Sequence, residues 1–84
     1  MKHASQGAID RLGGLLATLR AIEGLNEKRP GIFYRKSRAF LHFHEDPAGL
    51  FADIRDRAGV DFDRFDVTDQ ALWPGLITEV LKRL

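Results

Sequence analysis

Residues 40–55 read FLHFHEDPAGLFADIR, and they are the most informative stretch of the chain. Apolar side chains alternate with polar ones on both sides of a central Asp-Pro-Ala-Gly sequence. Residues 46–49 fit a type I turn, because Asp stands first, Pro second and Gly fourth. The pattern therefore favours an antiparallel hairpin in which residues 50–55 form the second strand.

The same letters also fit a helix over residues 47–57. Asp46 would then be the N-cap, Pro47 the first helical residue and Gly59 the stop. We favour the strand and keep the helix as the alternative. The apolar stripe of such a helix would consist of Leu50, Phe51, Ile54 and Ala58.

Residues 4–23 are expected to form a helix, with Ser5 as its N-cap and Gly24 as its left-handed C-cap. The Gly13-Gly14 pair inside it is expected to destabilise the helix by about 1 kcal/mol per glycine relative to alanine. Close packing of another element against the glycines would make this loss tolerable. Apolar residues recur at spacings of three and four, and they form one stripe. The stripe consists of Ile9, Leu12, Leu15, Leu16, Leu19 and Ile22.

A polar connector over residues 26–31 precedes two strands rich in aromatic residues, Ile32–Arg35 and Arg38–Asp46, with Lys36-Ser37 as the turn between them.

Residues 61–67 read as a further short strand. Thr68 can cap the segment that follows it. A terminal helix is expected to break or to begin at Trp73-Pro74, because proline lacks the backbone N–H that a helix interior needs. Its stripe is Leu76, Ile77, Val80, Leu81 and Leu84.

The expected order of elements is α-β-β-β-β-α, within a single domain over residues 1–84. This order implies an α+β, two-layer fold with an N-terminal helix, a three- or four-stranded antiparallel sheet and a C-terminal helix. Both helices are expected on one face of the sheet.

Composition indicates a small globular domain, because 44% of the 84 residues are hydrophobic and 30% are charged. The chain has no cysteine, which excludes disulfides, thiolate metal sites and cysteine nucleophiles and fits a cytoplasmic location. No apolar run reaches the roughly 18 residues of a membrane span. Thirteen basic residues against 12 acidic ones give a net charge of +1, which argues against nucleic acid as a partner.

His42 and His44 are two residues apart, so on a strand both imidazoles point to the same side. If residues 46–49 form a four-residue loop, His42 pairs with Asp53. Two imidazoles and a carboxylate on one side suit Zn²⁺ or non-haem Fe²⁺. In this register the sequence predicts a site for Zn²⁺ or another divalent metal at His42, His44 and Asp53.

The register of the hairpin has an alternative. If residues 47–49 form a three-residue loop with a bulged glycine, His42 pairs with Ile54 and the metal site loses Asp53. The four-residue loop is supported by the single core face that it creates. That face consists of Leu41, Phe43, Leu50, Ala52 and Ile54.

A two-residue turn at Lys36-Ser37 would pair Phe33 with Phe40. Together with Phe51 and Arg55, these residues would form an aromatic face that the helices leave uncovered. Such a face predicts association, as a homodimer or with a protein partner of unknown identity. It would also suit stacking of a single-stranded nucleic acid. The reverse assignment of the two faces would place the phenylalanines under the helices.

Arg35, Lys36 and Arg38 surround the first turn and could form a rim that binds nucleic acid or phosphate. Basic residues at a turn more often stay solvated and keep a sheet edge from aggregating. No serine–histidine–acid spacing and no phosphate-binding glycine loop stands out, so we do not expect an enzyme.

The FLHFHEDPAGLFADIR segment, followed by DFDRFDV, resembles a group of short, uncharacterised bacterial proteins. The resemblance covers the central half of the chain and implies no activity or catalytic residue. The order of helix, sheet and helix is also similar in architecture to frataxin-type and YjbR-type folds. A frataxin-like iron site would need an acidic first helix, whereas residues 4–23 contain only Asp10 and Glu23 as acids.

Overall fold

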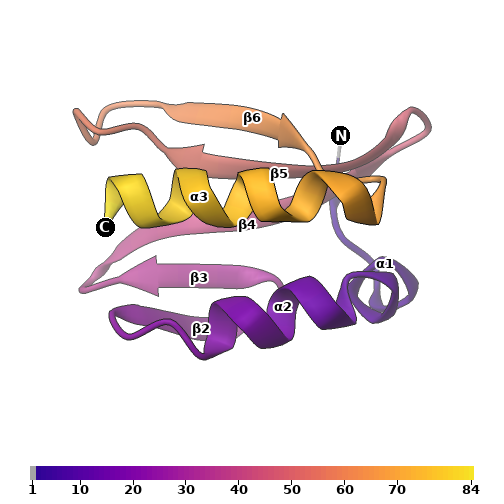
Figure 1. Cartoon of the computed structure of the whole chain (residues 1–84), viewed down its shortest axis with the longest axis horizontal. Helices are drawn as coiled ribbons and strands as arrows, with labels where there is room; N and C mark the ends of the chain where they lie inside the picture. The colour runs from indigo at the N-terminus through magenta and orange to yellow at the C-terminus, as the bar shows by residue number, and fades with distance from the viewer. Residues whose placement is uncertain (1) are drawn as a thin grey trace.

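The computed structural model describes residues 2–84 as two layers, in which helices cover one face of an antiparallel sheet (Figure 1). The expected α+β class is confirmed, but the sheet has six strands instead of three or four. In chain order the elements are β1 Lys2–His3, α1 Gln6–Arg11, α2 Gly13–Arg20, β2 Leu25–Arg29, β3 Ile32–Arg35, β4 Arg38–Asp46, β5 Gly49–Arg55, β6 Phe62–Asp66, the 3-10 helix η1 Gln70–Leu72 and α3 Trp73–Arg83.

The strands follow the order β2-β3-β4-β5-β6, and every pair is antiparallel. β3 pairs with residues 38–42 of β4, and β1 pairs with residues 44–45 along the same edge. β4 therefore has a partner on each side over most of its length. This arrangement brings the N-terminal residues beside the histidines of β4.

The central hairpin has the register expected for the loop at residues 46–49. Asp46 pairs with Gly49, and His42 pairs with Asp53. Residues 49–55 form a strand, so the helical alternative for residues 47–57 is excluded. Gly49 has a φ of 146°, and a Cβ at this position would lie 2.2 Å from the Oγ1 of Thr68. Glycine is therefore required where the hairpin passes the chain that follows β6.

The β3–β4 hairpin departs from the expected register at a bulge. Tyr34 pairs with Ala39 as expected, but Phe33 pairs with Leu41 instead of Phe40. Because paired residues share a face, this shift places Phe33 under the helices, where its exposed fraction is 0%. Phe40, beside the bulge, is 5% exposed and belongs to the core. The prediction that both phenylalanines lie on an uncovered face is wrong.

The N-terminal helix is shorter than predicted and is broken at Leu12, whose φ is −90° and ψ is 7°. Ser5 is its N-cap, as expected, and its hydroxyl accepts from the N–H of Ala8 at 3.4 Å. The break precedes the glycine pair, where helix propensity is weakest. A Cβ on Gly14 would lie 3.3 Å from the Trp73 ring, which shows close packing of α3 there.

β2 overlaps the segment over residues 26–31 predicted to be a polar connector. The sequence of β2, LNEKR, lacks the apolar alternation that identifies a half-buried strand. It forms a strand because it pairs with β3 at the edge of the sheet, where Asn26, Lys28 and Arg29 stay in solvent.

The C-terminal helix begins at Trp73, and Pro74 lies in its first turn, as expected. Thr68 does not cap it. The Thr68 hydroxyl accepts from the N–H of Leu50 at 2.9 Å, and Asp69 caps the preceding 3-10 helix instead. Leu76 and Val80 of the expected stripe are buried, whereas Leu81 is 54% exposed.

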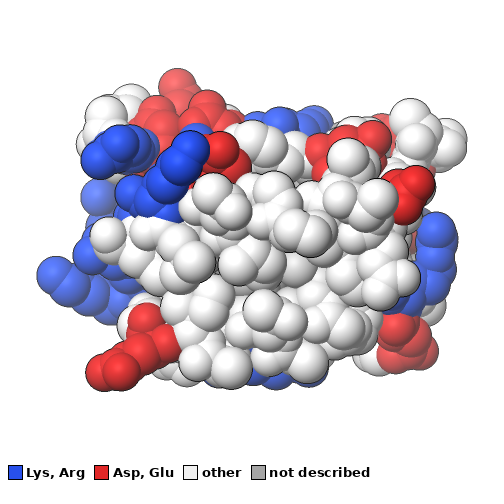
Figure 2. Space-filling model, in the orientation of Figure 1, with Lys and Arg blue, Asp and Glu red and all other residues white. Residues whose placement is uncertain are grey.

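The core lies between the helices and one face of the sheet, and it includes Leu15, Leu16, Leu41, Phe43 and Ile54. Seen from the helical side, charged side chains gather around the margins, and the middle of that face carries mostly uncharged residues (Figure 2). No helix within residues 2–84 is long and apolar enough to cross a membrane.

Adjacent residues of β3 test the bulge. Phe33→Ala is expected to destabilise the protein by about 3–5 kcal/mol, because it leaves a cavity in the core. Tyr34→Ala, on the opposite face, is expected to cost under about 1 kcal/mol. Urea unfolding measures both changes. Equal costs for the two variants would contradict the observed register.

Glu27 connects α2 to the β2–β3 turn. Its carboxylate accepts from Arg20 Nε at 2.5 Å, from Arg20 Nη2 at 3.0 Å and from the N–H of Gly31 at 3.0 Å. The hydrogen bond from Arg20 is the main cause that holds the pKa of Glu27 below its usual value. The Glu27 carboxylate therefore stabilises the folded state fully at pH values above the usual glutamate pKa. This stabilisation is lost as the pH falls through the lowered pKa of the folded state.

Glu27→Gln is expected to destabilise the protein at pH 7 by about 1 kcal/mol or less, because Arg20 is half exposed and solvent screens the pair. The difference from wild type should shrink at pH 3, because this pH lies below the ordinary pKa of glutamate and part of the stabilisation is already lost. Urea unfolding at both pH values measures it. A deficit that stays the same at both pH values would show that the charge of Glu27 contributes nothing.

Candidate metal centre

The face of the sheet opposite the helices carries polar and aromatic side chains from neighbouring strands. Because register pairs share a face, His42 lies beside Asp53 and Asp53 beside Arg64. In the next row, His44 lies between His3 and Phe51. We call this side the outer face. It also includes Ile32, Arg55, Phe62 and Asp66.

The two histidines of β4 meet through their ring nitrogens. His42 Nδ1 lies 2.8 Å from His44 Nε2, and the rings are close to perpendicular, with an interplanar angle of 77°. His44 Nδ1 is buried and has no hydrogen-bond partner within residues 2–84. The expected convergence of the two imidazoles is therefore present.

Asp53 joins this pair from β5. Its Oδ2 lies 3.3 Å from His44 Nε2, and the residue is 7% exposed. The predicted trio of His42, His44 and Asp53 offers one ligand atom each, all within 4.8 Å of one another. Sequence and structure therefore agree on which residues come together.

Arg64 binds the same carboxylate from β6. Its Nε donates to Asp53 Oδ1 and its Nη2 to Asp53 Oδ2, both at 2.8 Å. This two-point contact fixes the plane of the carboxylate. The sequence analysis did not assign Arg64 a part in the site, although the pairing of residues 53 and 64 would follow from the register of β5 and β6.

His3 is a further residue that the sequence analysis missed. Its ring stacks on His44 with centroids 4.9 Å apart, and its centroid lies 6.1 Å from that of His42. The side chain is exposed. Two residues of β1 are too short a segment for a pattern, so only the pairing with β4 reveals this third imidazole.

The electrostatic state of the trio suits cation binding. Burial is the main cause that lowers the pKa of both His42 and His44. Both rings are therefore neutral at pH 7, with lone pairs for a ligand. The hydrogen bond from Arg64 is the main cause that lowers the pKa of Asp53, which stays ionised.

The aromatic part of the outer face is smaller than predicted. Phe51 is half-buried beside His44, and Phe62 lies between His42, whose ring centroid is 4.6 Å away, and Arg55. The Arg55 guanidinium covers the Phe62 ring at 4.6 Å. Association through this face stays a prediction. Two of the three phenylalanines predicted for the face, Phe33 and Phe40, are buried in the core instead.

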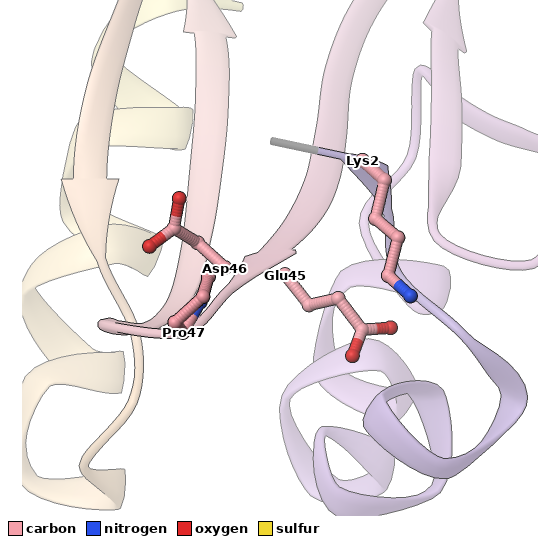
Figure 3. Close-up of a pocket in the computed structure, with 4 residues that line it drawn as sticks. All are labelled: Lys2, Glu45, Asp46 and Pro47. Atoms are coloured by element: carbon pink, nitrogen blue, oxygen red, sulfur yellow. The ribbon is translucent and has the colours of Figure 1, made fainter.

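A shallow hollow lies at the end of β4, lined by Lys2, Glu45, Asp46 and Pro47 (Figure 3). Asp46 and Glu45 point away from each other in this view. The Glu45 carboxylate accepts a hydrogen bond from the N–H of Ser5, and Asp46 accepts from the N–H of Ala48 at 2.8 Å. Both acids thus stabilise local backbone, and we assign the hollow no ligand.

The predicted rim of Arg35, Lys36 and Arg38 lies around a different hollow, at the β3–β4 turn. It faces the β5–β6 loop and includes no member of the histidine trio. The structure therefore keeps the predicted basic rim and the predicted metal ligands as separate features.

No protein-family model, curated protein or solved structure matches the chain. The resemblance of the central segment to short bacterial proteins therefore stays a prediction. Any functional assignment depends on the side chains described above.

Arg64→Gln tests the arrangement around Asp53. Removing the guanidinium is expected to raise the pKa of Asp53 towards its usual value, because the main stabilising contact of the carboxylate is lost. A carboxyl NMR titration measures this pKa. Arg57→Gln is the matched control, since Arg57 is an exposed arginine outside the cluster. An unchanged pKa in R64Q would contradict the two-point contact.

Proposed function

We propose that the outer face binds a divalent transition-metal ion, with Zn²⁺ as the reference ion, through His42, His44 and Asp53. The observation that carries the proposal is the convergence of two imidazoles and a carboxylate, with ligand atoms within 4.8 Å of one another. Nitrogen and carboxylate oxygen are the usual ligands of zinc in sites that retain an open coordination position.

The two histidine nitrogens are already near the separation that a bound ion would impose. Zinc–nitrogen bonds of about 2.0–2.1 Å in tetrahedral geometry place two ligand nitrogens about 3.3–3.4 Å apart. His42 Nδ1 and His44 Nε2 are 2.8 Å apart. A ring rotation that moves one of these nitrogens by a fraction of an ångström would reach the larger separation. The ion would then take the place of the hydrogen bond between the two rings.

Neutral imidazoles also reduce the competition from protons. A histidine must be deprotonated to bind a metal, and burial holds both rings in that form at neutral pH. The ionised Asp53 supplies the negative charge. Arg64 then acts as an outer contact that orients the carboxylate, while its own charge limits the affinity.

His3 can supply a further imidazole from β1. Because its side chain is exposed and its ring stacks on His44, it can rotate towards an ion more freely than the half-buried pair. A third imidazole would give three histidines and one carboxylate. The proposed site therefore joins β1 to the central hairpin.

The test is a Zn²⁺ titration of untagged, chelator-stripped protein, followed by backbone amide NMR and by competition with a zinc-sensitive dye. Saturable shifts are expected around residues 3, 42–44 and 53. At a free concentration of 100 times Kd, binding should stabilise the fold by about 2.7 kcal/mol.

His42→Ala and His44→Ala are each expected to weaken Zn²⁺ binding by more than about tenfold, and Asp53→Asn by about tenfold. His3→Ala should have a smaller effect than H42A or H44A. Asp61→Asn is the control, because it removes an exposed carboxylate outside the trio. Wild-type affinity in both H42A and H44A would refute the proposal.

A further inference from the structure

We infer that the hollow at the β3–β4 turn is a binding site for a small phosphorylated molecule. The hollow has a volume of about 320 Å³, which lies within the range of small-ligand pockets. It lies between the β3–β4 turn, the end of β5 and the β5–β6 loop. The basic residues lining it are Arg35, Lys36, Arg38, Arg55, Arg57 and Arg83.

The charge of this site is strongly one-sided. Within the described chain, five of these six cations form no salt bridge, and only Arg83 is paired, with Asp63 and Glu79. Figure 2 shows basic side chains at the left end of the molecule, with acidic ones above and below them, and Figure 1 places both turns at this end. The net charge of the whole chain is only +1, but the basic residues around this hollow form a local positive patch.

Asp56 is the one acid among the residues that line the hollow, and within residues 2–84 it forms no salt bridge with the basic ones. Its carboxylate accepts from the N–H groups of Val60 at 3.0 Å and Asp61 at 3.2 Å. These hydrogen bonds fix the β5–β6 loop. The Asp56 carboxylate is thereby held by its own loop, and it lowers the positive charge of the hollow by one without pairing with an arginine.

Two guanidinium groups that line the hollow bind the same backbone carbonyl. Arg38 Nη2 donates to the carbonyl oxygen of Gly59 at 2.8 Å, and Arg55 Nη1 donates to the same oxygen at 3.2 Å. A single neutral carbonyl does not offset two positive charges at this separation. An anion that contacts both groups would remove this repulsion.

The site is rigid on its inner side. Arg55 Nε donates to the carbonyl of Ala39 at 2.7 Å, and its guanidinium lies on Phe62. Gly59 has a φ of 74°, and a Cβ there would lie 3.2 Å from Arg38 Nη1. Glycine thus permits both the turn and the close approach of Arg38. The loop presents its carbonyl, and with it both arginines, in one fixed arrangement.

Phosphate is the anion that this arrangement suits best. Each guanidinium offers parallel N–H donors that match two phosphate oxygens, and neither arginine uses all of its donors on the protein. Several further cations line the rim, so a ligand with more than one phosphate would gain further contacts. The size of the hollow favours a small molecule over a polymer.

The test is a pyrophosphate titration at low salt, followed by amide NMR and calorimetry. Chelator-stripped protein is used, so that no metal at the histidines bridges the anion. Saturable shifts are expected at residues 38 and 55–59, with an affinity that falls as KCl is added. Arg38→Gln should weaken binding about tenfold, and Arg38→Lys, which keeps the charge but loses the paired donors, should weaken it less.

Two controls separate a site from general charge attraction. Arg11→Gln removes a basic residue from α1, which lies towards the other end of the molecule (Figure 1), and should leave the pyrophosphate affinity unchanged within about twofold. The oligonucleotide dT12 is titrated in parallel. Absence of saturable pyrophosphate binding, equal losses in R11Q and R38Q, or binding of dT12 alone would each overturn the inference.

Discussion

The register between β4 and β5 is the constraint on which the rest of this structure depends. It places Leu41 and Ile54 together under the helices and His42 and Asp53 together on the opposite side. A slip of one residue would reverse both faces, exposing the core side chains and burying the polar cluster. The Asp46–Gly49 turn and the hydrogen bond from the N–H of Leu50 to the hydroxyl of Thr68 hold the strands in this position.

The helices cover only one face of the sheet, so the side chains of the other face are not required for the core between helices and sheet. An antiparallel sheet tolerates this because its side chains alternate, so polar residues can occupy the outer face without entering the core. Asp53 is nevertheless 7% exposed, and its burial is offset by contacts with Arg64 and His44. The cluster is therefore closely packed, and only small parts of the His44 and Asp53 side chains reach solvent, 13% and 10% respectively.

The outer face and the basic hollow adjoin through one aromatic ring. Phe62 contacts His42 on one side and Arg55 on the other, with 4.6 Å to each. Neutral imidazoles and an ionised carboxylate thus lie close to unpaired guanidiniums on a single small domain. The two proposed ligands have opposite charge, so binding of one would favour binding of the other by electrostatic attraction.

The sequence alone indicated the α+β class, and it favoured the central hairpin because of two-residue periodicity and a turn with strong residue preferences. It brought Asp53 to His42 and His44 in only one of two possible hairpin registers, and the structure has that register. Only the tertiary structure decided the rest. The bulge that buries Phe33, the polar edge strand β2 and the pairing that brings His3 to His44 all arise from backbone pairing between segments. Local patterns do not encode that pairing, because a bulge or an edge position follows from which strand lies alongside.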